Sequence, residues 1–199
     1  MNLDPRRAAV LALHWQVNVI EPEGFFGPML SGPVARSGVV DRAVRFHEAA
    51  GVPVFFTRFT IPEGEGGLVR NTGFMRAVGD AQEAFRPDAP GARLIPRMAG
   101  GTPTVVDNQK LSGLAGGDLA SRLSGQGVDT LFLTGVATNL TVEQTARHGT
   151  DLGFTVHVVS DCVTAADDAA HTASLANLEL TTAGCLTAGE ALARLRVRS

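Results

Sequence analysis

One stretch, residues 128–147, constrains the fold of this chain more than any other. It begins with the mainly apolar run 128–133, which has the length and composition of a buried strand. Gly135 ends that strand, and Asn139 stands at a good N-cap position before a helical spacing of apolar residues. Such a unit points backbone N–H groups at a ligand, and the helix N-terminus favours negative charge there. Thr141 would overlook that pocket; the alternative is an ordinary strand-to-helix connection with Thr141 as a first-turn residue.

Length and composition favour a single globular domain over residues 1–199, with 44% hydrophobic and 19% charged residues. The formal net charge of −3 gives no electrostatic footprint for nucleic acid, and no apolar run is long enough to span a bilayer. The N-terminus lacks a signal-peptide core, so we expect a cytoplasmic protein. Cys162 and Cys185 are too few for a disulfide framework and read as small buried hydrophobes. No Cys, His and carboxylate cluster has metal-ligand spacing, so we expect neither a metal nor a cofactor.

Strand patterns and helix patterns alternate about six times along the chain, with no repeat or linker between them. This alternation predicts an α/β fold, a parallel sheet with helices on both faces. We expect strands at 8–13, 54–57, 103–107, 128–133, 154–160 and 181–186, helices at 34–50, 74–85, 118–123, 169–178 and 188–195, and loops at 21–33 and 61–73.

The carboxyl ends of parallel strands meet at one edge of the sheet, where such folds bind ligands. His14, Arg58, Asn108 and the turn 135–141 all fall at predicted strand ends. We therefore expect these side chains to surround one site.

Four segments, taken in order, resemble the isochorismatase-like family, also called the cysteine hydrolase superfamily: residues 10–16, 55–58, 127–147 and 153–162, with His171 after them. The Gly-Val-Ala-Thr-Asn segment 135–139 is the most specific of these features. The resemblance implies a three-layer αβα fold with a six-stranded parallel sheet, usually in homodimers or higher homo-oligomers. Family members hydrolyse amides such as nicotinamide or carbamoyl compounds, or cleave the vinyl ether of isochorismate.

The resemblance also exposes a loss, because the family's amidases use an Asp, a Lys and a Cys. The Asp position, two residues before a retained Gln16, is His14 here; the Lys position is Asn108 and the Cys position is Thr141. The isochorismate-cleaving branch keeps the Asp, so the chain departs from that branch too. Nicotinamidase-type members carry an Asp-and-His metal site after the second strand, and residues 59–63 offer nothing equivalent.

Cysteine works in such triads because its thiolate is populated near neutral pH, whereas a threonine hydroxyl needs a strong base. Thr141 is therefore expected to form a hydrogen bond or to cap the helix. Lys110 lies two residues beyond Asn108 and would face the same side of a continuing strand, where it would restore the cation; a surface lysine is the alternative.

His14 is the main catalytic candidate, because a histidine at a strand end titrates near neutral pH and passes protons in either direction. A structural histidine is the alternative. For substrate binding we expect Arg58 to hold a carboxylate, unless it is a surface residue. Trp15 is either a binding platform or part of the core. The remaining candidates are Gln16, Ala137 and Leu140.

These expectations describe a hydrolase-like enzyme that acts on a small organic substrate, a carboxylated one included, by acid–base rather than thiol chemistry. His14 would move the proton, Asn108 and Thr141 would fix polar groups, and N–H groups near Ala137 would stabilise negative charge. The alternative is an inactive family member that binds a ligand or a partner enzyme. A pocket filled by Phe25, Phe26 or Trp15 would favour that alternative.

Overall fold

The computed structural model describes residues 3–196, which contain one parallel sheet of six strands. Along the sheet the strands follow the order β3-β2-β1-β4-β5-β6, so β1 and β4 lie at the centre. The strands are β1 (Ala8–Leu13), β2 (Val54–Phe59), β3 (Thr104–Asn108), β4 (Thr130–Val136), β5 (Thr155–Thr164) and β6 (Cys185–Leu186). The predicted α/β fold is confirmed.

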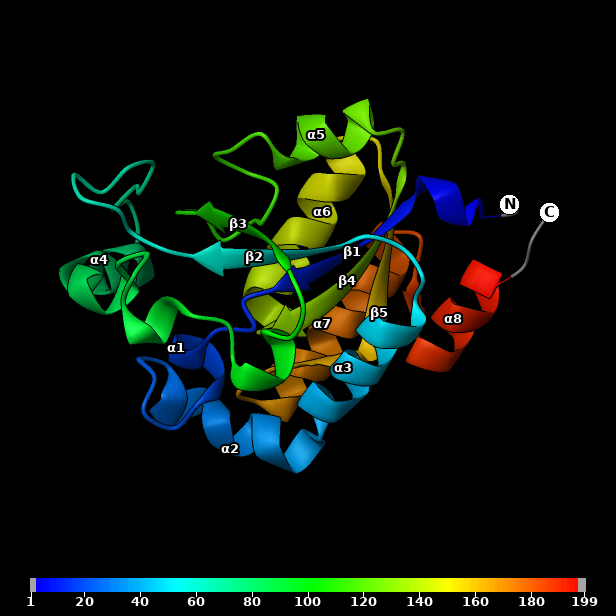
Figure 1. Cartoon of the computed structure of the whole chain (residues 1–199). Coiled ribbons are helices and arrows are strands. Elements are labelled where there is room, and N and C mark those ends of the chain that lie inside the picture. Colours follow the sequence, from blue (N-terminus) through cyan, green and yellow to red (C-terminus); the bar gives the residue numbers. More distant parts are fainter. Residues whose placement is uncertain (1–2, 197–199) are drawn as a thin grey trace.

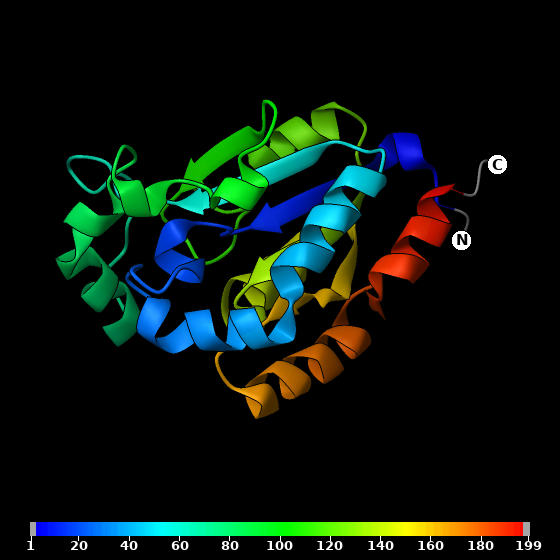
Figure 2. The ribbon, with the colours of Figure 1, turned by 60° about the horizontal axis from the view of Figure 1, so that its bottom comes forward.

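Helices cover both faces of this sheet, as Figures 1 and 2 show from two directions. One face carries α2, α3 and α8, and the other carries α5, α6 and α7. The helices are α1 (Val17–Ile20), α2 (Gly27–Ser37), α3 (Val39–Ala49), α4 (Gly73–Asp80), α5 (Leu119–Gly125), α6 (Glu143–Asp151), α7 (Asp168–Thr181) and α8 (Ala188–Arg196). Short helical turns lie at η1 (Pro5–Arg7), η2 (Gln82–Phe85), η3 (Pro90–Ala92), η4 (Pro96–Met98) and η5 (Thr138–Val142).

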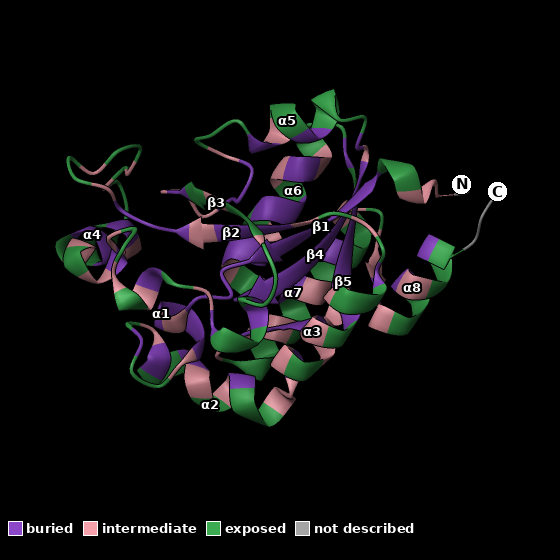
Figure 3. Cartoon of the chain, in the orientation of Figure 1, coloured by how far each residue is buried: buried purple, intermediate pink, exposed green. Residues whose placement is uncertain are grey.

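Residues of strand β1 are continuously apolar rather than alternately apolar and polar, because both faces of this central strand are covered. Its six residues are all buried, with Ala8, Val10 and Ala12 packed on the α3 side of the sheet and the alternate residues on the α6 side. The same burial extends along β4, and the two strands form the core of the molecule in Figure 3. The edge strand β3 is largely exposed instead.

The strand order reverses between β1 and β4, because later strands are added on the opposite side of β1. Strands β2 and β3 extend the sheet on one side of β1, and β4, β5 and β6 extend it on the other. A parallel sheet opens a crevice at the carboxyl ends of its strands where the order reverses. His14 follows β1 and Ala137 follows β4, so both lie at this position.

The turn after β4 differs from the expected one. Gly135 does not end the strand; it lies within β4 at a register shift against β5, and the strand continues to Val136. The peptide bond from Val136 to Ala137 is cis, Ala137 is the N-cap, and a single π-helical turn leads into α6. Asn139 is therefore inside the turn, and the prediction that it caps the helix was wrong.

Other boundaries were also predicted wrongly. The expected helix 34–50 is the end of α2 and the whole of α3, which are separated by Gly38 at φ of 63°. The expected loop 21–33 contains the start of α2, where Pro28 is tolerated because a first-turn residue needs no N–H partner. Leu30 and Val34, four residues apart, bury one side of that helix. The expected loop after residue 160 is the end of β5, which continues to Thr164.

Gly135 provides a test of the central pairing, because it adopts φ of 138° opposite Leu13. A Cβ at this position would stand 2.2 Å from the Leu13 carbonyl oxygen. We predict that Gly135→Ala lowers the free energy of unfolding by more than about 2 kcal/mol. Urea unfolding monitored by circular dichroism measures this change.

The matched control is Gly125→Ala at the end of α5, where an added Cβ meets nothing within 4 Å. It should stabilise the protein slightly, by no more than about 1 kcal/mol, because alanine favours helix. Equal unfolding midpoints for the two variants would contradict the prediction.

Candidate functional site

A small cavity of about 40 Å³ lies at the carboxyl ends of β1, β2 and β4. His14 and Thr141 are its polar lining residues; every other residue in its wall is apolar. Four phenylalanines from separate parts of the chain contribute to the wall: Phe26, Phe59, Phe74 and Phe85. The rings of Phe26 and Phe74 are stacked with centroids 5.7 Å apart, and Phe59 and Phe85 meet edge to face at the same centroid distance. These aromatic contacts link the end of β2 to α4 and η2 around the cavity.

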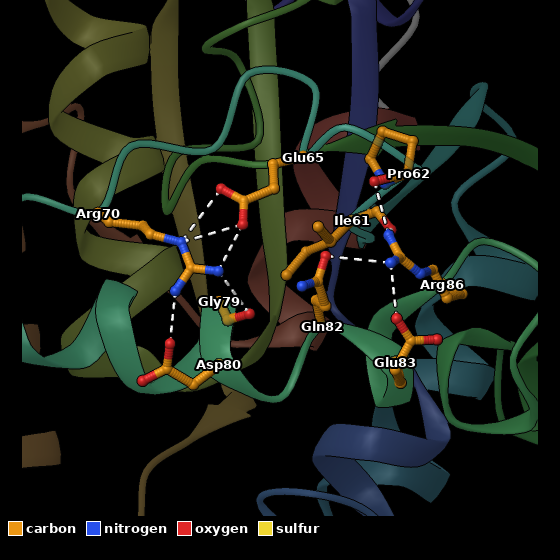
Figure 4. A network of polar contacts seen from close by, with 9 residues as sticks. All are labelled: Ile61, Pro62, Glu65, Arg70, Gly79, Asp80, Gln82, Glu83 and Arg86. Carbon is orange, nitrogen blue, oxygen red and sulfur yellow. Dashed lines mark hydrogen bonds and ion pairs between the residues drawn. The ribbon is translucent and has the colours of Figure 1, made fainter.

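A polar network holds the outer wall of the cavity in place (Figure 4). Arg70, in the loop after β2, hydrogen-bonds Glu65, Asp80 and the carbonyl of Gly79, which ties that loop to α4. These hydrogen bonds raise the pKa of the Arg70 guanidinium and lower the pKa of the Glu65 carboxyl. Arg86 hydrogen-bonds Glu83 and the carbonyls of residues 61 and 62. The network thereby fixes the segments that carry Phe74 and Phe85.

His14 occupies the inner end of the cavity. Its side chain is 7% exposed and contacts the edge of Phe59, and its backbone adopts φ of 54°, which is uncommon for a residue other than glycine. Within residues 3–196, the buried Nε2 atom has no hydrogen-bond partner. Burial lowers the pKa of the imidazole from 6.5 to about 4, so the ring is neutral at pH 7. The expectation that His14 titrates near neutral pH was therefore wrong.

Thr141 lies in the wall of the same cavity and is 2% exposed. Its hydroxyl donates a hydrogen bond of 2.8 Å to the carbonyl oxygen of Leu111, so its oxygen retains only acceptor capacity toward the cavity. Ala137 and Leu140 line the cavity beside it. The structure thus brings together His14, Thr141, Ala137 and Leu140 from the predicted site.

Gln16 and Asn108 lie outside the cavity wall and support it. The Gln16 side chain accepts from the backbone N–H of Phe59 at 2.7 Å and donates to the carbonyls of Phe59 and Ala92. It thereby links the end of β1 to the end of β2. Asn108 donates to the carbonyl of Ser112 at 2.8 Å, which closes the loop that carries Leu111.

Trp15 points away from the cavity, into the core beneath α3. It is fully buried, and its indole N–H donates to the hydroxyl of Thr134 at 3.3 Å. Thr134 also shares a hydrogen bond of 2.8 Å with Nε2 of His47. Of the three aromatic residues whose presence in the pocket would favour the inactive alternative, Phe26 is in its wall, whereas Trp15 and Phe25 are outside it.

Neither of the expected cationic groups lines the cavity. Arg58 forms a bidentate ion pair with Asp107 on β3, with N···O distances of 2.7 and 2.8 Å. Lys110 lines a separate and more open hollow, together with Ser112, Arg147 and His148. Leu111 separates the two, because it contributes to the walls of both.

Of the four phenylalanines in the wall, the sequence had pointed to Phe26 alone. Phe59 ends β2, so its position at a strand end was a visible signal. Phe74 and Phe85 gave no such signal, because their contribution depends on how α4 and η2 fold back over the sheet edge.

Across residues 3–196 no group of three or more His, Cys, Asp and Glu side chains is arranged to hold a metal ion. The residues after β2 are Thr60, Ile61 and Pro62, and they do not fit the metal site of nicotinamidase-type relatives. In the same range no helix is both long and apolar enough to cross a membrane.

Comparison with known proteins assigns the chain to a family. The model of the isochorismatase domain matches residues 8–190. The chain belongs to the isochorismatase family. Among curated proteins it is 27% identical over 190 residues to YecD of Escherichia coli O157:H7, an uncharacterized isochorismatase family protein, and this match covers 88% of the chain and 89% of YecD. A shorter match, 38% identical over 76 residues, covers 38% of the chain and 30% of the ureidoacrylate amidohydrolase RutB of Methylobacterium radiotolerans.

Solved structures of this family share the fold. A cysteine hydrolase from Pseudomonas syringae pv. phaseolicola superimposes with a TM-score of 0.82 at 24% identity, over 98% of this chain and 95% of that one. A pyrazinamidase/nicotinamidase from Streptococcus mutans superimposes with a TM-score of 0.68 at 21% identity, over 90% and 99% of the two chains.

The buried histidines make the stability of this isochorismatase-family protein depend on pH. Burial lowers the pKa of both His14 and His47 to about 4. Above pH 6.5 both the folded and the unfolded chain hold neutral imidazoles; below it, the unfolded chain takes up protons first. We predict that the free energy of unfolding falls as the pH drops from 6.5 to 4, by roughly 3 kcal/mol for His14.

Urea unfolding at a series of pH values measures this effect. His14→Asn should reduce the fall, because asparagine tolerates the positive φ and does not titrate. An unchanged pH dependence in His14→Asn would contradict the prediction.

The two cysteines should be unreactive in the folded protein. Burial raises the pKa of Cys162 to about 12 and of Cys185 to about 11, so neither thiol ionises near pH 7. We predict that iodoacetamide labels both at pH 7.5 far more slowly in the native protein than in urea. Mass spectrometry of the labelled protein measures the rates, and one rapidly labelled native thiol would show that the prediction is wrong.

Proposed function

We propose that this isochorismatase-family protein is an enzyme that carries out acid–base chemistry on a small organic molecule without a thiol intermediate. The observation that carries the proposal is the buried Nε2 atom of His14, which faces no hydrogen-bond partner in residues 3–196 and belongs to a cavity wall. Leaving a buried polar atom unpaired destabilises a fold, so such an atom in a cavity is suited to a ligand. The names of two relatives, a cysteine hydrolase and an amidohydrolase, support chemistry of the hydrolase type.

His14 is the proposed proton carrier. Its neutral imidazole accepts a proton from the substrate without first losing one, and returns it to a leaving or product atom. The apolar wall excludes water around it, which strengthens each electrostatic interaction inside. Hydrolysis, elimination and isomerisation all need such a group.

The turn after β4 is the proposed site of negative charge. Ala137 and Leu140 line the cavity. The N–H groups of Leu140 and Val142 donate to the Ala137 carbonyl, so the groups that this turn would offer to a ligand are the earlier ones, at Thr138 and Asn139. These groups would stabilise an oxyanion formed beside Thr141. Asn108 acts indirectly, because its hydrogen bond to Ser112 fixes the loop that carries Leu111.

A second candidate is a family member that binds its ligand without turnover. Two observations favour it: the hydroxyl of Thr141 is engaged with the Leu111 carbonyl, and Phe26 narrows the cavity. Under either function, the family resemblance supports a homo-oligomer in the cytoplasm as a further proposal.

The test is substitution of His14, on whichever substrate a screen for turnover identifies. We predict that His14→Asn lowers the rate by about 10²–10⁴-fold, the usual contribution of a general acid or base. The wild-type rate should be flat near pH 7 and fall as the pH approaches about 4, because protonated His14 is no longer a base.

His47→Gln is the matched control, because His47 has the same lowered pKa but lies outside the cavity, in the last turn of α3. Full activity in a correctly folded His14→Asn variant would show that His14 is structural. Tight ligand binding with no turnover by the wild type would establish the second candidate.

A further inference from the structure

The cavity wall carries no charge in the part of the chain that the structure describes. His14 is neutral at pH 7, Thr141 is uncharged, and the other lining residues are apolar. A charged ligand group that enters such a wall loses its water and gains no counter-ion, which is strongly unfavourable. The cavity therefore selects against both anions and cations.

The surrounding charges do not compensate for this wall. The Arg58 guanidinium is held by both oxygens of Asp107, and its third contact is the carbonyl of Ala92. Lys110 lies in the separate hollow beyond Leu111. A carboxylate in the cavity would have no cation from either residue.

Side chains supply few hydrogen bonds in the cavity. The neutral imidazole of His14 carries one donor and one acceptor nitrogen, and its buried Nε2 has no partner within residues 3–196. Thr141 has given its proton to Leu111 and only accepts. A ligand with a single uncharged oxygen needs few partners, whereas an amide brings two N–H groups and a carbonyl into a wall that is otherwise apolar.

The volume limits the size of the buried group. A cavity needs roughly 10–15 Å³ on this measure to hold one water molecule, so about 40 Å³ accommodates only a few non-hydrogen atoms. The phenylalanine rings around this space offer contact surface to a short branched alkyl group.

We propose that this cavity binds a compact, uncharged and mainly apolar molecule with one oxygen, an alcohol or a ketone of about six non-hydrogen atoms, with that oxygen hydrogen-bonded to the imidazole of His14. The proposal names the substrate class of the site and rests on the proposed function for the acid–base role of His14. Of the three reactions named above, elimination and isomerisation apply to an alcohol or a ketone, whereas hydrolysis does not.

The test is a titration of the whole protein at pH 7 with four probes of nearly equal size. These are 3-methyl-2-butanol, 3-methyl-2-butanone, isobutyramide and isobutyrate, and nuclear magnetic resonance measures each dissociation constant. We predict that the alcohol or the ketone binds at least about tenfold more tightly than isobutyrate and isobutyramide. The imidazole ¹⁵N resonances of labelled His14 should shift with that probe, and the spectrum of His14→Asn assigns these resonances.

Met29 provides a matched pair of variants, because it lines the cavity and is 48% exposed, so that neither substitution disturbs the core. Met29→Lys adds a cation at the rim and should raise the affinity for isobutyrate at least about threefold relative to Met29→Gln. The ratio of the two dissociation constants for isobutyrate measures how much affinity a cation at the rim adds.

Equal or tighter binding of isobutyrate by the wild type would overturn the proposal, as would the absence of binding by the alcohol and the ketone at about 100 mM. Binding of the alcohol or ketone without any turnover would leave the ligand class standing and contradict the proposed enzyme. Turnover that depends on His14 but is confined to carboxylated substrates would support the proposed enzyme and contradict the proposed ligand class.

Discussion

The pairing of β1 with β4 is the constraint on which the site depends. Leu13 lies opposite Gly135, and the backbone of the two strands is so close there that no Cβ fits at residue 135. This contact fixes how far the end of one strand stands from the end of the other. Because the strand order reverses between them, His14 and the turn after β4 meet across a single cavity.

Burial then decides the chemistry that this cavity supports. The same apolar surroundings that complete the core make the charged form of His14 unfavourable, so the ring is neutral and its Nε2 is unpaired in residues 3–196. Burial acts in the opposite direction on the thiols, whose pKa values it raises.

The cavity wall depends on segments that are not part of the sheet. Gln16 ties the ends of β1 and β2 together, and the Arg70 and Arg86 networks hold α4 and η2 over the sheet edge. These contacts are polar, yet their effect is to keep phenylalanine side chains against the cavity. Such an uncharged wall suits an uncharged ligand better than a carboxylate, whether or not the ligand is turned over.

The sequence by itself determined the order of the strands along the chain, both ends of β1, and the placement of His14 after β1 and of Thr141 in the turn after β4. It could do so because periodicity and strand composition are local properties. Only the tertiary structure decided which side chains face the cavity. Arg58 pairs with Asp107 on a neighbouring strand, and Lys110 lies behind Leu111. Residue spacing carries no information on such partners, which are distant in the chain. The lowered pKa of His14 had the same origin, since it arises from burial by residues that folding brings together.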